Sequence, residues 1–127
     1  MTFKLLNWNV EWAKPGTKRG SLVQNIIQSH EPQVTCVTES FDNQFESGHT
    51  ICADPDYGYT IKQGRRKVLL WSKEPWRDID SFGHECLPTG RFVAGTTTTP
   101  VGDIRFVGVC IPWSAAHVST GRKDRKR

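Results

Sequence analysis

The stretch that decides the fold runs from Lys4 to Glu39, KLLNWNVEWAKPGTKRGSLVQNIIQSHEPQVTCVTE. Its two ends are apolar and rich in aromatic or β-branched residues, and the segment between them is amphipathic. This order predicts a strand, a helix and a second strand that lies parallel to the first. The carboxyl ends of both strands then emerge at one edge of the sheet, where open α/β sheets bind ligands. We therefore expect Asn9 and Glu39 to meet at that edge.

The amphipathic segment, SLVQNIIQSHEP, carries start and stop signals for a helix. Ser21 and Gln24 have the spacing of a capping box, which predicts that the helix begins at Ser21. Pro32 is expected to end it, because proline cannot continue a helix. Four apolar residues fall on one face of such a helix: Leu22, Val23, Ile26 and Ile27.

The remainder of the chain reads mainly as strands and turns. Strands are expected at five places: Tyr57–Lys62, Lys67–Lys73, Arg77–Ile79, Phe92–Thr99 and Ile104–Ile111. The last two should form a hairpin, because a short turn sequence joins them. Residues 40–56 are polar and should form a loop, with a short helix near residues 41–46. Several strands after one strand–helix–strand unit predict a mixed sheet in the α/β (α+β) class, with a single helix to cover it.

Composition and charge limit the number of domains and the classes of partner that we expect. A chain of 127 residues, 36% hydrophobic and 24% charged, has the balance of one globular domain. The formal net charge is +4, and much of the excess lies in Arg65-Arg66-Lys67 and in residues 122–127. This balance permits a phosphate-bearing partner without demonstrating one. We divide the chain into a domain over residues 1–113 and a basic tail over residues 114–127, which we expect to be disordered.

The four cysteines show neither a CxxC pair nor zinc-finger spacing to histidine. Cys36 and Cys110 lie inside predicted strands, where a reduced, buried thiol is the ordinary interpretation. No apolar stretch has the length of a signal peptide or a membrane span, so we expect a cytoplasmic protein without membrane contact.

Three polar residues at the two strand ends carry the candidate chemistry. Glu39 would bind a hard cation, since Mg²⁺ takes one or two protein carboxylates and completes its shell with water and substrate phosphate. Asn9 would donate to a phosphate oxygen or orient a carboxylate, and Glu11, two residues on, would offer a second carboxylate. Simpler roles stay open: a solvated acid for Glu39 and a backbone cap for Asn9. Arg91 would bind phosphate at the same edge or lie on the surface.

Two motifs resemble the opening of the endonuclease/exonuclease/phosphatase superfamily, the metal-dependent phosphodiesterases related to deoxyribonucleases and abasic-site endonucleases. Trp8-Asn9-Val10-Glu11 is similar to the family's W-N-[VI]-acid strand end, and Pro32–Ser40 to its P-D-I-[IV]-[CA]-[LV]-Q-E-[TS] strand. Val68–Pro75 resembles the strand that ends in Ser-[RK]-x-Pro. Ile104–Trp113 resembles the strand that ends in Tyr-x-Pro-Asn, but a cysteine stands at the tyrosine position, which leaves the substrate open.

The resemblance implies a fold, a site and an activity. The family fold is a four-layer α/β/β/α sandwich, of which this chain would be the N-terminal half. Glu39 would be the metal ligand for Mg²⁺ or Mn²⁺, Asn9 the active-site asparagine, and Glu11 would stand where some members carry an auxiliary aspartate. The family's later G-D-x-N and S-D-H motifs do not occur in this sequence. The chain would thus be a truncated, inactive portion of a phosphoester hydrolase that lacks its C-terminal half or self-associates.

A second hypothesis belongs to a different class. The chain would be a non-enzymatic basic module that binds nucleic acid or another phosphate-bearing partner. Trp71, Trp76 and Trp113 lie near the basic segments and would be compatible with stacking on a single strand. Burial in the core is the alternative role for most of these tryptophans.

Overall fold

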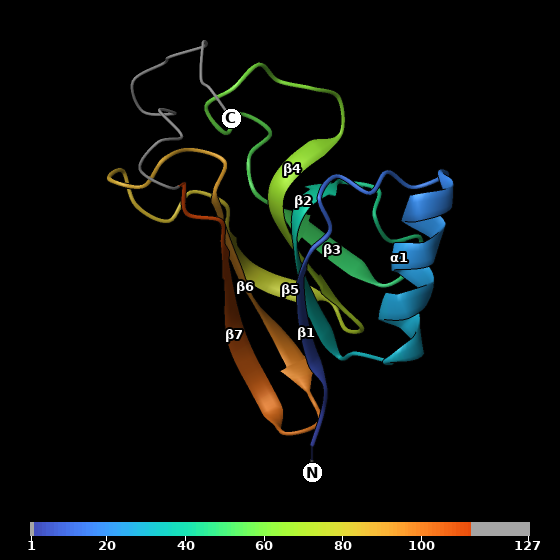
Figure 1. The fold of residues 1–127 in the computed structure, drawn as a ribbon. Helices are drawn as coiled ribbons and strands as arrows, with labels where there is room; N and C mark the ends of the chain where they lie inside the picture. The colour runs from blue at the N-terminus through green and yellow to red at the C-terminus, as the bar shows by residue number, and fades with distance from the viewer. Residues whose placement is uncertain (1, 113–127) are drawn as a thin grey trace.

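A computed structural model describes residues 2–112, which form two β-sheets and one helix (Figure 1). The elements in chain order are β1 (Leu5–Asn9), α1 (Lys18–Ser29), β2 (Val34–Phe41), β3 (His49–Cys52), β4 (Arg65–Ser72), β5 (Trp76–Asp80), β6 (Phe92–Thr99) and β7 (Gly102–Val109). The first sheet has the order β1-β2-β4-β3 and the second the order β5-β6-β7. This arrangement confirms the predicted α/β (α+β) class. Trp113 and the predicted tail over 114–127 lie outside the described residues.

The first sheet is mixed, and its parallel part is the predicted strand–helix–strand unit. β1 pairs with β2 in parallel from Leu5↔Val34 to Asn9↔Thr38, and α1 makes the crossover between them. β4 pairs with β2 and with β3 in antiparallel fashion. The second sheet is antiparallel, and its β6–β7 pair is the predicted hairpin.

The helix begins three residues earlier than the sequence predicted. Thr17 is the N-cap: its backbone is extended, and its hydroxyl oxygen accepts a hydrogen bond from the Gly20 amide at 3.0 Å. The proposed capping box at Ser21 is therefore wrong. Gly20 is buried, and a Cβ at this position would lie 1.9 Å from the Lys14 carbonyl oxygen. The close approach of the preceding loop thus requires glycine within the first turn.

The buried face of α1 is narrower than predicted. Val23 and Ile27 are buried against the first sheet, whereas Leu22 and Ile26 are exposed. Pro32 follows the helix, which ends at Ser29.

Three local predictions between β2 and β4 are wrong. The expected loop contains strand β3, which is stabilised by its pairing with β4 rather than by its own polar sequence. The expected helix near residues 41–46 is a turn, in which the Gln44 side chain accepts from the Phe41 amide and donates to the Ala13 carbonyl. The expected strand over 57–62 is absent from the described chain, and Tyr57 at its start stacks on Trp12.

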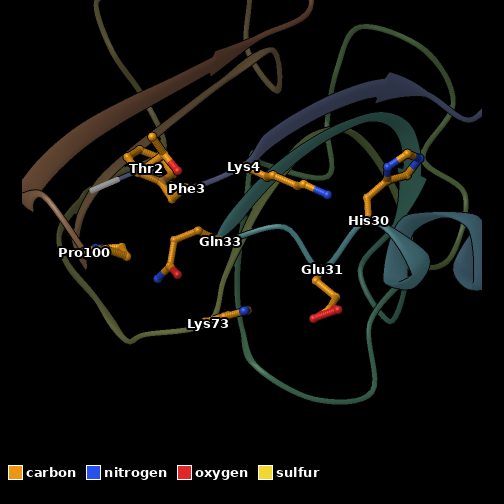
Figure 2. Close-up of a pocket in the computed structure, with 8 residues that line it drawn as sticks. All are labelled: Thr2, Phe3, Lys4, His30, Glu31, Gln33, Lys73 and Pro100. Carbon is orange, nitrogen blue, oxygen red and sulfur yellow. The ribbon is translucent and has the colours of Figure 1, made fainter.

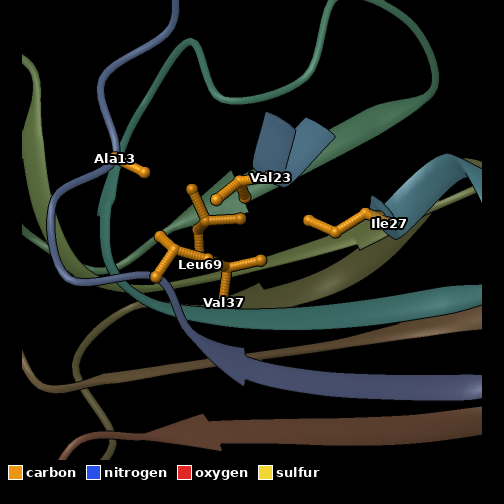
Figure 3. Packing of buried hydrophobic residues seen from close by; sticks show 6 residues of the cluster. Ala13, Val23, Ile27, Val37 and Leu69 are labelled. Atoms are coloured by element: carbon orange, nitrogen blue, oxygen red, sulfur yellow. The ribbon is translucent and has the colours of Figure 1, made fainter. Parts of the chain in front are cut away.

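The core has two parts, one on each face of the first sheet. Six buried residues pack between α1 and the first sheet (Figure 3): Val10, Ala13, Val23, Ile27, Val37 and Leu69. A second cluster of four lies between the two sheets: Ala53, Val68, Leu70 and Val93. Successive β4 residues therefore serve opposite faces, as the alternation of a strand requires. The second sheet supplies cover that the sequence did not predict.

The outer face of the second sheet carries exposed apolar side chains. Val107 is 56% exposed, and Ile79 and Val109 are exposed as well. Within residues 2–112, the layers are thus one helix and two sheets, without a helix over this outer face.

In the described part of the chain, α1 lacks the length and apolar character of a bilayer-spanning helix.

Replacing Thr17 with alanine is expected to lower the free energy of unfolding by about 1 kcal/mol, because the Gly20 amide loses its acceptor. Ser21→Ala is the matched control, since Ser21 is exposed inside the helix, and it should change stability by less than about 0.5 kcal/mol. Urea unfolding followed by circular dichroism measures both. Equal losses in the two variants would contradict the assignment of Thr17 as the cap.

Candidate functional site

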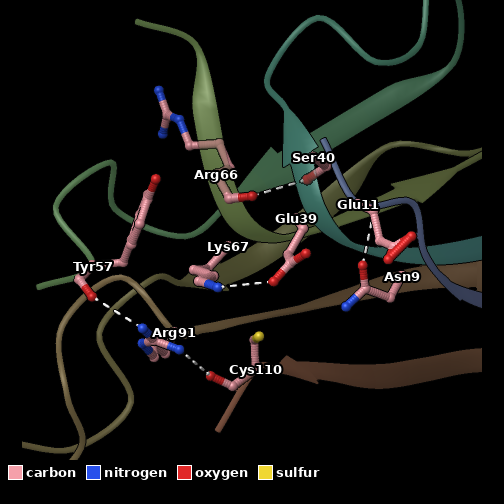
Figure 4. A network of polar contacts seen from close by, with 9 residues as sticks. All are labelled: Asn9, Glu11, Glu39, Ser40, Tyr57, Arg66, Lys67, Arg91 and Cys110. Atoms are coloured by element: carbon pink, nitrogen blue, oxygen red, sulfur yellow. Dashed lines mark hydrogen bonds and ion pairs between the residues drawn. The ribbon is translucent and has the colours of Figure 1, made fainter. Parts of the chain in front are cut away.

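Asn9 and Glu39 lie at the same edge of the first sheet, as the parallel geometry predicted (Figure 4). The backbone pairing continues past the end of β1. The Val10 amide donates to the Thr38 carbonyl at 3.1 Å, and the Trp12 amide donates to the Glu39 carbonyl at 2.7 Å. These bonds fix the two chain segments side by side and bring their polar side chains to one place.

The backbone at this edge is unusual. Glu11, Trp12 and Glu39 have φ angles of 50°, 61° and 50°, a left-handed conformation that costs non-glycine residues about 1–3 kcal/mol each. Arg19 from α1 stabilises the turn, because one of its guanidinium nitrogens donates to the carbonyls of Val10 at 2.9 Å and of Glu11 at 2.7 Å. Strain of this kind gathers at functional sites and persists only where surrounding contacts enforce it.

The Glu39 carboxylate is paired with Lys67 from β4. The Lys67 Nζ lies 3.1 Å from Glu39 Oε2, and the side chains are 12% and 25% exposed. The same ammonium lies 5.5 Å from the centre of the Trp12 ring and 5.7 Å from that of Tyr57. These two rings stack on each other at 5.9 Å. The sequence analysis missed Lys67 as a site residue, because its position follows from the antiparallel β2–β4 register.

Asn9 and Glu11 form a local turn next to Glu39. Asn9 Oδ1 accepts from the Glu11 amide at 2.9 Å, so the backbone-capping role left open by the sequence is present. This bond leaves the Asn9 amide NH₂ to donate to another group. Glu11 is exposed, and its side chain lies next to Asn9 (Figure 4).

The donor set fits a divalent cation only with help from a substrate. Among residues 2–112, no three His, Cys, Asp or Glu side chains form a cluster suited to a metal ion. Glu39 offers one carboxylate, which suffices for Mg²⁺ where water and substrate phosphate supply the other ligands. Lys67 already places a positive charge on one oxygen of that carboxylate. A divalent ion at this carboxylate would therefore need ligands from water and substrate, and it would lie close to the Lys67 ammonium.

Arg91 is a buried residue, so its interpretation as a surface arginine is wrong. It is 4% exposed, and its guanidinium donates to the carbonyls of Cys110 and Tyr57, each at 3.3 Å. These contacts join the end of β7 to the loop that follows β3. Arg91 lies beside the candidate site in Figure 4, where its phosphate-binding role stays a prediction.

The thiols near the core are not activated. Burial raises the pKa of Cys36 and of Cys52 to about 11, so both are protonated thiols at neutral pH. Cys36 is a free cysteine within β2, as expected, but it is half-buried rather than fully buried. Both cysteines serve as packing residues rather than nucleophiles.

Two hollows lie at the opposite end of the first sheet, where β1 and β2 begin. One of about 390 Å³ is lined by Thr2, Phe3, Lys4, His30, Glu31, Gln33, Lys73 and Pro100 (Figure 2). The other, of about 310 Å³, lies between the end of α1 and Trp71. Neither includes Asn9 or Glu39, so these hollows are separate from the candidate site.

Comparison with known proteins gives a likeness of fold. The chain matches neither a protein-family model nor a curated protein sequence. Among solved structures, it is similar to the 3′ phosphatase NExo from Neisseria bound to a product DNA hairpin. The TM-score is 0.58 with 19% sequence identity over 85% of this chain, which spans 41% of the NExo chain. The chain therefore shares its fold with part of that phosphatase.

Replacing Arg91 with methionine is expected to lower the free energy of unfolding by about 2–3 kcal/mol, because two carbonyls lose charged donors in a buried place. Arg77→Met is the control, since Arg77 pairs with Asp103 on the exposed surface, and its loss should stay below about 1 kcal/mol. Chemical denaturation measures both variants. Similar losses would show that the buried contacts of Arg91 do not stabilise the fold.

Proposed function

We propose that this chain supplies the metal-binding part of a phosphoester hydrolase of the nuclease or phosphatase type. Glu39 would bind Mg²⁺ or Mn²⁺, and Asn9 would position the phosphate. The observation that carries the proposal is the meeting of these residues on a strained, cross-linked backbone where the parallel pairing of β1 with β2 ends. The likeness of fold to a 3′ phosphatase supports the same class of chemistry.

The role of each residue follows from its contacts. A bound Mg²⁺ would polarise the phosphoryl group and offset its charge. Glu39 would hold the ion through its carboxylate, which faces the Lys67 ammonium (Figure 4). Asn9 would donate through its amide NH₂, since its oxygen is engaged by the Glu11 amide. Glu11, being exposed, would act on the ion through water.

A proton-handling group would come from outside the described residues. Three histidines are described: His30 lines the hollow at the far end, His49 opens β3 at that same end, and the His84 ring accepts from the Cys86 amide. None of these contacts links a histidine to Asn9 or Glu39. The partner would be a further part of the domain or a second copy, and it would pack on the exposed apolar face of β7.

The substrate would be a phosphate ester, and a nucleic-acid end is the first to test. NExo is described as a 3′ phosphatase with a product DNA hairpin. In this chain, the site opens at a sheet edge next to the stacked rings of Trp12 and Tyr57.

The alternative of a non-enzymatic basic module receives less support. Its three neighbouring basic residues are engaged within the chain: Arg65 lies 4.5 Å over the Trp12 ring, Arg66 contacts Asp42 and the Ala53 carbonyl, and Lys67 pairs with Glu39. The two described tryptophans of that hypothesis are engaged as well.

Their indole groups anchor loops and strands. Trp71 donates to the Ser47 carbonyl and stacks on Phe45, while Trp76 donates to the His49 carbonyl. These contacts favour a structural role for both rings over stacking on nucleic acid.

The chain alone is expected to be inert, while its complete domain hydrolyses phosphate esters in a manner that depends on Glu39. Positioned acid–base groups contribute about 10²–10⁴-fold, and none of the contacts of the three described histidines links them to Asn9 or Glu39. The assay uses Mg²⁺ or Mn²⁺ with plasmid DNA, a 3′-phosphorylated oligonucleotide and a chromogenic phosphodiester. It compares the purified chain with the chain extended through the reading frame that continues it.

Glu39→Gln should lower the rate of the extended protein at least about a hundredfold, because metal ions stabilise the transition state by several kcal/mol. Glu46→Gln is the matched control, since Glu46 is an exposed carboxylate in the turn before β3. Near-normal turnover of the Glu39→Gln protein would place the metal elsewhere. Activity of the isolated chain above its own Glu39→Gln variant would overturn inertness.

A further inference from the structure

We propose that Lys67 is a built-in counter-ion of Glu39 that competes with the divalent metal for its carboxylate. The inference rests on the proposed function, because it takes Glu39 as the metal ligand. It assigns a new positioning role, since Lys67 acts on the metal through Glu39 rather than on the reacting atoms. Its consequence is that a divalent ion binds Glu39 weakly until a phosphate anion arrives.

The first step of the argument is geometric. Lys67 Nζ lies 3.1 Å from Glu39 Oε2, at hydrogen-bond distance from an oxygen that a metal would use. Thr38 of β2 pairs directly with Val68 of β4. Glu39 follows Thr38, and Lys67 precedes Val68 in the antiparallel strand. The strand register thus fixes Lys67 opposite Glu39. A metal ion at this carboxylate would meet the ammonium at close range.

The second step concerns what holds the ammonium there. Lys67 is 12% exposed, and its charge lies near the faces of Trp12 and Tyr57, which attract cations. The Trp12 backbone is itself bonded to the Glu39 carbonyl. The same group of residues, Trp12, Tyr57 and Glu39, therefore holds both the ammonium and the carboxylate. The two rings would keep the ammonium in position when a second cation approaches Glu39.

The third step is a count of charge. Glu39 and Lys67 together are neutral, so a divalent ion would leave the assembly with an excess of two positive charges. Repulsion between a unit charge and a divalent ion about 5 Å apart corresponds to about a tenfold change in affinity even with the dielectric constant of water. A phosphate anion offsets this excess. Metal and phosphate are thus expected to bind together, with the ammonium contributing to the attraction for the phosphate.

The test is the affinity of the purified chain for Mn²⁺, measured by electron paramagnetic resonance of the free ion. Lys67→Met should bind Mn²⁺ at least about tenfold more tightly than the wild type. Lys67→Arg keeps the charge and should bind as weakly as the wild type. Lys73→Met removes the same charge at the far end of the sheet, and it should leave the affinity unchanged.

Two further proteins make the result decisive. Lys67→Gln repeats the test with a polar side chain if Lys67→Met fails to fold by circular dichroism. The double variant Glu39→Gln/Lys67→Met should lose the gain in affinity. If Lys67→Met and the wild type bind Mn²⁺ with equal affinity while Glu39→Gln loses affinity, the counter-ion role is overturned and Glu39 stays the ligand. Affinity unaffected by Glu39→Gln in every background would overturn both the role of Lys67 and the proposed metal site.

Discussion

The parallel pairing of β1 with β2 is the constraint on which the candidate site depends. It runs from Leu5↔Val34 to Asn9↔Thr38, and two backbone bonds extend it beyond the strand ends. The crossover through α1 lets two distant segments meet in this way. Arg19 on that helix then binds the carbonyls of the turn after β1. The helix therefore both covers the sheet and fixes the polar edge.

The same pairing explains why the edge is strained and charged. Glu11 and Trp12 after β1 and Glu39 within β2 have left-handed backbone conformations, and the Glu39 carboxylate lies next to a cation from β4. A carboxylate that is already paired with an ammonium binds a divalent ion differently from a carboxylate without a partner. It is stable without a divalent ion, and it gains most from an ion that arrives with phosphate. The preference would tie metal binding to the presence of substrate.

The sequence predicted those features that arise from local patterns. Alternating and amphipathic stretches located β1, α1 and β2 and the β6–β7 hairpin, and the rule for parallel strands placed Asn9 beside Glu39. The sequence-based predictions were wrong where the structure of a segment depends on residues distant in sequence. The N-cap is Thr17 rather than Ser21, and the loop before the helix approaches so closely that Gly20 has no room for a Cβ. The second sheet, strand β3 and the partnership of Lys67 with Glu39 follow from strand register, which one sequence does not reveal.

The central claim is that Glu39 marks the place where this chain binds a divalent cation. Nuclear magnetic resonance of the ¹⁵N-labelled chain with increasing Mn²⁺ tests it most directly, because the paramagnetic ion broadens nearby amide signals. The account predicts selective broadening at Asn9 and Ser40, with the Gln33 signal at the far end of the sheet unaffected. Broadening centred on Gln33 and Lys4 instead, with the Asn9 and Ser40 signals unchanged, would contradict it.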